Sequence, residues 1–239
     1  MNPAYIDFLA RKAPRAQSSG FEPKALPGHL FDFQQECVAF CLRKGRTGLY
    51  LDTGLGKTRC QLEWAAQSAE QSNGKALLLT PLAVAKQIER EATALGYEAR
   101  VIRDQSEARD GINICNYDRL DKLDVNEFGA VSLDESSILK SFNGKTCEAL
   151  ISAFSGHRFR LSATATPAPN DHMELGNQAA FLGVMQANEM LMRWFINDTK
   201  EASQQWRLKG HAADDFWDWM ASWSRMAQNP EDLGYDGSR

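Results

Sequence analysis

The chain has 239 residues, of which 43% are hydrophobic and 24% are charged. These values exclude a mostly disordered chain, and the length allows one substantial domain with its own core, alone or with an appendage. The formal net charge of −4 argues against a surface that binds polyanions over its whole extent, so any contact with nucleic acid is expected to be a local patch.

The sequence shows no disulfide framework, metal motif or membrane segment. Its five cysteines are an odd number, and none forms a C-x-x-C pair or stands at metal-ligand spacing from a histidine. We expect them to be reduced and mostly buried thiols. No apolar run approaches the ~20 residues that a membrane span needs, and residues 1–20 lack a signal-peptide core. A cytoplasmic protein with no membrane partner is therefore expected.

The predicted elements alternate between helices and strands along the chain. Residues 1–27 are expected to form an N-terminal arm with a short helix at residues 5–12. Further helices are expected over residues 30–42, 59–72, 81–95, 142–154 and 171–182, and strands over residues 49–51, 76–80, 100–103, 112–115, 128–133 and 159–162. The run at residues 76–80 is apolar without interruption, as in a strand buried on both faces. This alternation predicts an α/β fold with a mostly parallel, doubly wound sheet.

The segment after residue 183 has a different composition. Five of the six tryptophans lie between residues 190 and 223, at a loose helical spacing that predicts an α-helical, Trp-rich extension. Their rings could stack on nucleic-acid bases, but a small hydrophobic core is the favoured interpretation. We therefore divide the chain into an N-terminal arm (1–27), a main α/β domain (28–183), a helical extension (184–229) and a linker or tail (230–239).

The connection between the first strand and the next helix has the composition of a phosphate-binding loop. It reads Asp-Thr-Gly-Leu-Gly-Lys-Thr at residues 52–58. Glycines let the backbone come close enough for several N–H groups to point at a polyphosphate. Lys57 is expected to reach the β- and γ-phosphates, and the Thr58 hydroxyl to ligate Mg²⁺. The full P-loop pattern has Gly where Leu51 stands, so a simple strand-to-helix turn remains the alternative.

Two carboxylates, Asp134 and Glu135, follow directly after the strand at residues 128–133. An ATPase needs one carboxylate at the tip of a neighbouring strand to hold Mg²⁺, and a second to orient or deprotonate the attacking water. We assign the first role to Asp134 and the second to Glu135. Solvated acids at a strand end are the ordinary alternative, but the position of this pair after Lys57 in the same alternation favours catalysis.

Other polar groups could complete the site. Ser162, Ala163 and Thr164 follow another strand, where small hydroxyl residues can bond to the acidic pair and sense the γ-phosphate; a turn that caps the next helix is an equal alternative. Gln34 precedes the loop and could read an adenine edge, although a solvated glutamine is more common. Basic side chains that could contact nucleic-acid phosphates, or form a solvated face, are Lys86, Arg90, Lys140, Lys145, Arg158 and Arg160.

Several short motifs occur in the order found in a known family. They are Phe-Gln, Gly-Leu-Gly-Lys-Thr, Leu-Thr-Pro-Leu, Asn-Tyr, Asp-Glu-Ser-Ser and Ser-Ala-Thr-Ala-Thr-Pro. Together they resemble superfamily 2 helicases and translocases, and most of all the SWI/SNF-like DEAD/DEAH-box proteins of bacteriophages. The resemblance covers residues 28–183 and implies a RecA-like domain in a bacterial or phage-infected cell, with ATP and Mg²⁺ as cofactors.

The resemblance implies roles for particular residues. The residues implied to bind ATP are Gln34, Thr53, Gly54, Leu55, Gly56, Lys57 and Thr58, with Thr58 and Asp134 as metal ligands. The stretch at residues 162–164 takes the place of the motif that couples ATP state to movement. Pro81, in a motif Ia-like stretch, and Asn116 and Tyr117, at a later strand edge, are implied to contact nucleic acid, with DNA preferred to RNA.

Two departures from the family pattern bear on function. Ser137 stands where relatives have a His or Asp that links the state of the bound ATP to the coupling motif. We therefore expect this link to be made by other residues here. Relatives also place ATP between two RecA-like domains, the second of which supplies an arginine finger, and residues 184–239 do not resemble such a domain. We therefore expect the first motor domain of a longer, split or truncated protein, with a second RecA-like domain in the longer or a partner chain.

The expected function is an ATP-hydrolysing motor domain of a DNA helicase or translocase. A missing arginine finger costs on the order of 10³ or more in turnover, so the domain alone is expected to be a weak ATPase. One alternative is a half-motor that binds nucleotide or DNA and is catalytically incomplete without a partner chain. Another is a P-loop phosphotransferase, which would need a lid with clustered arginines.

Overall fold

The computed structural model describes residues 16–140, 144–198 and 205–237, and most of its strands form one sheet. These strands are β1 (Arg46–Leu51), β2 (Lys75–Thr80), β3 (Ala99–Val101), β4 (Gly111–Asn116), β5 (Ala130–Asp134), β6 (Phe159–Ala163) and β9 (Ser224–Ala227). The sheet has seven strands in the order β3-β4-β2-β5-β6-β1-β9, and every neighbouring pair is parallel. All seven strands therefore end at the same edge, which is where ligands bind in open α/β sheets.

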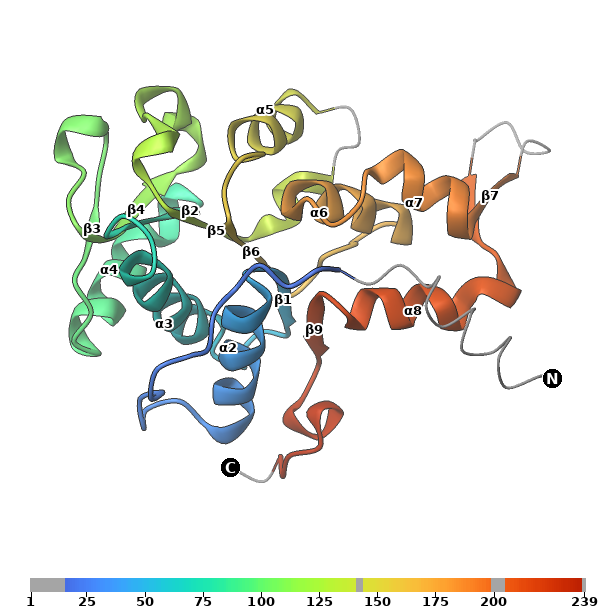
Figure 1. Ribbon diagram of the computed structural model, residues 1–239, viewed down its shortest axis with the longest axis horizontal. Coiled ribbons are helices and arrows are strands. Elements are labelled where there is room, and N and C mark those ends of the chain that lie inside the picture. The colour runs from blue at the N-terminus through green and yellow to red at the C-terminus, as the bar shows by residue number, and fades with distance from the viewer. Residues whose placement is uncertain (1–15, 141–143, 199–204, 238–239) are drawn as a thin grey trace.

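Helices cover both faces of this sheet (Figure 1). One face carries α2 (Asp32–Lys44), α3 (Lys57–Glu70) and α4 (Leu82–Ala94), and the other carries α5 (Lys145–Ala153), α6 (Leu175–Leu182), α7 (Ala187–Trp194) and α8 (Ala213–Ala221). Along β2, Leu77 and Leu79 join the core under α5 to α8, while Ala76 and Leu78 join the core under α2 to α4. Burial on both faces explains the uninterrupted apolar strands and confirms the predicted doubly wound α/β fold.

The predicted elements differ from the observed ones mainly at their ends. The helix predicted over residues 59–72 begins at Lys57, inside the glycine-loop motif. Pro81 is the N-cap of α4 rather than its first residue. The short helix predicted at residues 5–12 lies outside the described residues, as does part of the first turn predicted for the helix at residues 142–154.

The segment after residue 183 is less helical than its composition predicts. An antiparallel hairpin of β7 (Phe195–Asp198) and β8 (Gln205–Leu208) follows α7, and the chain then passes through α8 into β9. This last strand pairs with β1 over residues 224–227 and so belongs to the main sheet. Aromatic residues have high strand propensity as well as moderate helix propensity, so tryptophan spacing alone does not separate the two.

Three of the five tryptophans of this segment pack in a core, the interpretation favoured from sequence. Trp194, Trp219 and Trp223 are each at most 2% exposed. The rings of Trp194 and Trp219 stack with centroids 4.7 Å apart, and the buried Phe216 packs against both. These three tryptophans are therefore closed to nucleic-acid bases, whereas Trp217 is 39% exposed.

All five cysteines are free and buried, as predicted. Burial raises the pKa of Cys37 to about 12 and that of Cys147 to about 11, because an apolar environment disfavours the thiolate. Among the described residues, no group of three or more His, Cys, Asp or Glu side chains could hold a metal ion. No helix in the described ranges is long and apolar enough to cross a membrane.

Candidate nucleotide site and adjoining clefts

The predicted phosphate loop follows β1 and leads directly into α3. Gly54 and Gly56 have φ values of 90° and 76°, in the left-handed region that glycine adopts without strain. A Cβ at Gly56 would lie 2.3 Å from Gln34 Nε2, whereas a Cβ at Gly54 would meet no atom within 4 Å. A Cβ at position 56 would therefore displace the Gln34 carboxamide in addition to straining the backbone, while the space beside Gly54 stays open.

Lys57 begins α3, and its ammonium group lies back over the loop. Nζ donates to the backbone oxygen of Leu51 at 2.7 Å and to that of Asp52 at 3.2 Å. Phosphate oxygens are stronger acceptors for an ammonium group than neutral carbonyls are. A bound polyphosphate would therefore find this cation already placed beside the glycine loop.

A cavity of about 760 Å³ opens beside the loop, within the size range of small-molecule sites. It brings together most of the residues predicted for nucleotide binding and catalysis: Gln34, Thr53, Gly54, Gly56, Lys57, Thr58, Asp134 and Glu135. The backbone of Leu55, also predicted for this role, bonds to Gln34. The lining includes residues that the motifs do not identify, among them Phe31, which is 53% exposed, and Gln87 and Glu91 of α4.

Asp134 ends β5, and both of its carboxylate oxygens are hydrogen-bonded. Gln61 Nε2 on α3 donates to Oδ1 at 2.9 Å, and Thr80 Oγ1 at the end of β2 donates to Oδ2 at 2.7 Å. Ser132 Oγ in turn donates to Gln61 Oε1 at 2.8 Å and so orients this amide. The carboxylate is thus fixed at the cavity wall, which the Thr58 side chain also lines, and both carry hard oxygen atoms of the kind that could hold Mg²⁺.

The motifs do not predict the roles of Gln61 and Thr80, which donate to Asp134, or of Ser132, which orients Gln61. Ser132 interrupts an otherwise apolar strand, and because buried polar groups are nearly always hydrogen-bonded, this position carries a usable signal. The position of Thr80 at a strand end gives a weaker indication that its side chain bonds to a neighbouring strand. Nothing in the sequence marks Gln61, since a glutamine on a helix is ordinarily solvated, yet here it is fully buried.

Glu135 has a strained backbone. Its φ of 52° is the one positive value recorded for a non-glycine residue in the described part of the chain, and the left-handed region costs an L-residue roughly 1–2 kcal/mol. Such strain is concentrated at functional sites. Thr164 Oγ1 donates to Glu135 Oε2 at 3.3 Å and accepts from the N–H of Thr166 at 3.1 Å. Glu135 lines both the nucleotide cavity and a neighbouring cleft.

The three residues assigned to coupling have different surroundings. Thr164 is the member whose side chain bonds to the acidic pair. Ser162 Oγ lies 3.0 Å from the hydroxyl of Tyr50, and both side chains are buried. Ala163 is buried in the core on the α2 to α4 side of the sheet. A direct link between the acids and the end of β6 therefore runs through Thr164.

Gln34 lines the cavity with both ends of its carboxamide engaged. Oε1 accepts from the N–H of Phe31 at 3.0 Å, and Nε2 donates to the backbone oxygen of Leu55 at 3.0 Å. The residue is 2% exposed. These bonds tie the start of α2 to the phosphate loop, so Gln34 positions the loop, and its contact with adenine stays a prediction.

The residues predicted to contact nucleic acid line a second cleft, of about 520 Å³. It contains Pro81, Asn116 and Tyr117, and it shares Pro81 and Glu135 with the nucleotide cavity. The hydroxyl of Tyr117 donates to the backbone oxygen of Asp134 at 2.6 Å. Burial, followed by the charges of Asp134 and Glu135, holds the pKa of Tyr117 well above its usual value, so this hydroxyl remains a donor at neutral pH.

The six basic residues singled out from sequence do not act as one group. Arg160 is 2% exposed, and its Nη1 donates to the backbone oxygen of Phe181 at 2.6 Å. Burial lowers its pKa to about 10. Arg158 donates to backbone oxygens of residues before α2, whereas Lys86 and Lys140 line clefts at the sheet edge.

Comparisons with known proteins address the fold. No family model and no curated protein matches the chain. The SWI2/SNF2 ATPase core of Sulfolobus solfataricus in complex with dsDNA matches 90% of this chain and 47% of its own, with 17% identity and a TM-score of 0.66. The UvsW helicase of bacteriophage T4 matches 77% of this chain and 65% of its own, with 18% identity and a TM-score of 0.51. The Hef helicase domain of Pyrococcus furiosus matches 63% of this chain and 35% of its own, with 16% identity and a TM-score of 0.52.

These similarities show that the chain has a RecA-like fold, as the sequence predicts. The chain spans about half the length of the SWI2/SNF2 core that it matches.

Proposed function

We propose that this chain is the ATP-binding motor domain of a superfamily 2 helicase or translocase and couples ATP hydrolysis to movement on nucleic acid. The observation that carries the proposal is the convergence of a glycine loop, Lys57, Asp134 and Glu135 on one cavity. The fold similarity to helicase cores supports the same function. A P-loop phosphotransferase is not favoured, since the lining of this cavity contains a single arginine, Arg59, rather than the cluster that a lid would bring.

The site supports a division of labour among its residues. Backbone N–H groups of the loop would bind the phosphates. The Lys57 ammonium group would bind them too, and its bonds to phosphate oxygens would replace its present bonds to two backbone carbonyls. Thr58 and Asp134 would hold Mg²⁺, which neutralises charge on the phosphates when it is bound. Glu135 would orient the attacking water and accept its proton, with Thr164 holding the carboxylate in place.

Nucleic acid, with DNA preferred to RNA, would lie in the second cleft against Pro81, Asn116 and Tyr117. The bond from Tyr117 to the Asp134 backbone would link occupancy of this cleft to the catalytic carboxylates. A second RecA-like domain, in a longer or partner chain, would supply the arginine finger, whose absence lowers turnover by on the order of 10³ or more.

The proposal is tested by calorimetry of ATP binding, with Mg²⁺ present, to the wild type and to Lys57→Ala. Lys24→Ala is the matched control, because it removes an exposed lysine that pairs with Glu70, at the opposite end of α3 from the loop. We expect binding to the wild type and the control, and loss of binding in Lys57→Ala. Equal binding to all three proteins would contradict the proposed site. ATP binding without hydrolysis, even with DNA added, would favour the half-motor alternative.

A further inference from the structure

The chain after Glu135 forms a short 3-10 helix, Ser136–Lys140, which we call the Glu135 turn. The N–H of Ile138 donates to the backbone oxygen of Glu135 at 3.2 Å and so ties the glutamate to the turn. The second cleft is lined by Glu135 and by three residues of the turn, Ser137, Ile138 and Lys140. The position of the proposed general base therefore depends on what holds this turn.

Two neighbouring amides of α6 hold the Glu135 turn. Gln178 Nε2 donates to the backbone oxygen of Ser136 at 3.0 Å, and Asn177 Nδ2 donates to that of Leu139 at 2.7 Å. Gln178 is fully buried, and Asn177 is 3% exposed. In a buried environment such bonds are electrostatically stronger than in water. The amides of α6 thus fix the first and fourth residues of the turn.

The residue before Glu135 is fixed as well. Asp134 pairs with Ala163 of β6, and its backbone oxygen accepts from the hydroxyl of Tyr117 at 2.6 Å. Glu135, with its φ of 52°, therefore lies between a fixed strand end and a fixed turn. A strained backbone persists only where the surrounding structure over-determines it. Release of the turn would let Glu135 return to an unstrained conformation, and its carboxylate would leave its present position.

The hydrogen bonding of Gln178 is incomplete, which argues against a purely structural role. Within the described residues, Gln178 Oε1 and Ser136 Oγ are buried without a hydrogen-bond partner. A buried polar atom without a partner lowers stability, and an apolar side chain of similar size at position 178 would avoid this cost. The bond that Gln178 donates to the turn is therefore a better explanation for this residue than the stability of the fold.

The helix that carries the two amides is supported from behind by the aromatic core. A Cβ at Gly176 would lie 3.0 Å from the Cβ of Ala187 and 3.1 Å from the Cε of Met190, so the missing side chain lets α6 and α7 approach closely. Met190 is buried in the same core as Trp194 and Trp219. The Trp-rich segment thus backs the helix that holds the Glu135 turn.

We propose that Asn177 and Gln178 are positioning residues that hold Glu135 in its strained conformation through the turn after it, which rests on the proposed function and gives α6 a part in it. A general base contributes about 10²–10⁴-fold to a rate, and a misplacement of about 1 Å can cost ~10²-fold. In the described part of the chain neither amide lines the nucleotide cavity, so ATP affinity should not depend on them.

The test compares ATP hydrolysis in a single turnover, with Mg²⁺ in excess, by the wild type, Gln178→Met and Asn177→Leu. Both exchanges remove the amide donor and keep a side chain of similar size. We expect both variants to bind ATP with wild-type affinity in calorimetry and to hydrolyse it about 10²-fold more slowly. Wild-type hydrolysis by Gln178→Met would overturn the proposal and leave the proposed motor function intact.

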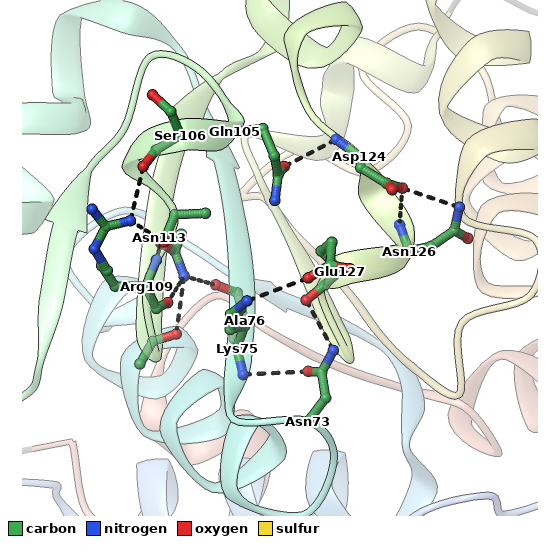
Figure 2. A network of polar contacts seen from close by, with 12 residues as sticks. Asn73, Lys75, Ala76, Gln105, Ser106, Arg109, Asn113, Asp124, Asn126 and Glu127 are labelled. Atoms are coloured by element: carbon green, nitrogen blue, oxygen red, sulfur yellow. Dashed lines mark hydrogen bonds and ion pairs between the residues drawn. The ribbon is translucent and has the colours of Figure 1, made fainter.

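The matched control is Asn113→Leu, which removes a buried amide from another part of the sheet (Figure 2). Asn113 is fully buried in β4, which β2 separates from β5, and its Nδ2 donates to the backbone oxygen of Arg109 at 2.7 Å. This variant should lose stability but hydrolyse bound ATP at the wild-type rate. Equal slowing in the control would overturn the proposal, because the loss of any buried amide would then be enough.

A second measurement does not require hydrolysis. It compares how far Gln178→Met lowers the midpoint of chemical denaturation in a Glu135→Ala and in a Glu135→Gly background. The alanine background bears the strain at position 135 and the glycine background does not. Loss of the Gln178 amide relieves strain in the alanine background alone, so the midpoint should fall less there. Equal lowering in both backgrounds would overturn the proposal, even if the wild type binds ATP without hydrolysis.

The same measurements separate this proposal from the proposed function. If the wild type binds no ATP, the proposed function fails, and the catalytic part of this proposal fails with it. Unequal lowering of the two midpoints would then still assign the hold on Glu135 to α6.

Discussion

The two ends of the edge where the strands of the sheet finish differ in how their polar side chains are held. At the nucleotide end, Gln34 and Asp134 are at most 8% exposed, and each is fixed by two hydrogen bonds. At the outer end, Arg100 and Arg103 are exposed, and their side chains form no ion pair in the described part of the molecule. The side chains at the nucleotide end are thus held in a fixed geometry, whereas the arginines at the outer end carry charge that no ion pair among the described residues neutralises.

This difference has a consequence for stability. Phosphoryl transfer depends on groups held within a fraction of an ångström of a productive arrangement, so the site must be built into the core. Exposed side chains away from the core contribute little to the free energy of unfolding. Substitutions should therefore lower stability at the nucleotide end and leave it nearly unchanged at the outer end.

The largest effect is expected from Gly56→Ala. Forcing alanine to a φ of 76° costs about 1–2 kcal/mol, and displacing Gln34 from Leu55 leaves buried groups unpaired for a further ~1–3 kcal/mol. Chemical denaturation should show a loss of about 2–5 kcal/mol in the free energy of unfolding. Gly54→Ala is the control, because it introduces the backbone strain without a contact between the new Cβ and Gln34. It should lower the free energy of unfolding by only about 1–2 kcal/mol. Equal losses would mean that Gln34 does not pack as described.

A smaller loss is expected for Asp134→Ala. Gln61 Nε2 and Thr80 Oγ1 would lose their acceptor inside the fold, which costs about 1–3 kcal/mol. Arg100→Gln, at the outer end, should stay within about 0.5 kcal/mol of the wild type. Chemical denaturation of Asp134→Ala and Arg100→Gln side by side measures the difference in stability between the two variants. Unfolding of both at the same denaturant concentration would contradict the expected difference between the two ends.

An effect smaller than that of Asp134→Ala concerns the backbone strain at Glu135. Glu135→Gly and Glu135→Ala remove the same carboxylate, but only glycine accepts a φ of 52° without strain. After allowance for the greater backbone entropy of glycine in the unfolded chain, Glu135→Gly should be more stable by about 1 kcal/mol. Thermal unfolding of both variants measures this difference in stability. A more stable alanine variant would show that the backbone at position 135 relaxes to an unstrained conformation without cost.

The sequence predicts the central part of the fold well, for an identifiable reason. Strands such as β2 and β5 are buried on both faces, which requires runs of apolar residues that can be read directly. In contrast, β9 reads Ser-Arg-Met-Ala, and two of these four residues are at least partly exposed. Its pairing with β1 is decided by the packing of α8 and not by its own composition, so no local pattern predicts it.

The candidate site shows the same division. The catalytic roles of Lys57, Asp134 and Glu135 stay a prediction, but their grouping around one cavity can be predicted, because a glycine loop and a strand end carry the residue types that a nucleotide site requires. The partners that hold them cannot, since Gln61 is buried only through the tertiary packing of α3 against β5. The basic side chains at the outer end are also hard to predict, because Arg100 lies on β3, Arg109 lies in the segment between β3 and β4, and Arg119 lies in the 3-10 helix after β4.

The pairing of β9 with β1 determines when the nucleotide loop can take its final form. Thr47 Oγ1 donates to the backbone oxygen of Trp223 across a separation of 176 residues, and the N–H of Asp52, at the entrance to the loop, donates to Ala227 at 2.9 Å. Contacts so distant along the chain form slowly. During synthesis β1 would stay an open strand edge until residue 227 emerges, exposed to pairing with other nascent chains, and the nucleotide loop would be among the last parts of the molecule to mature.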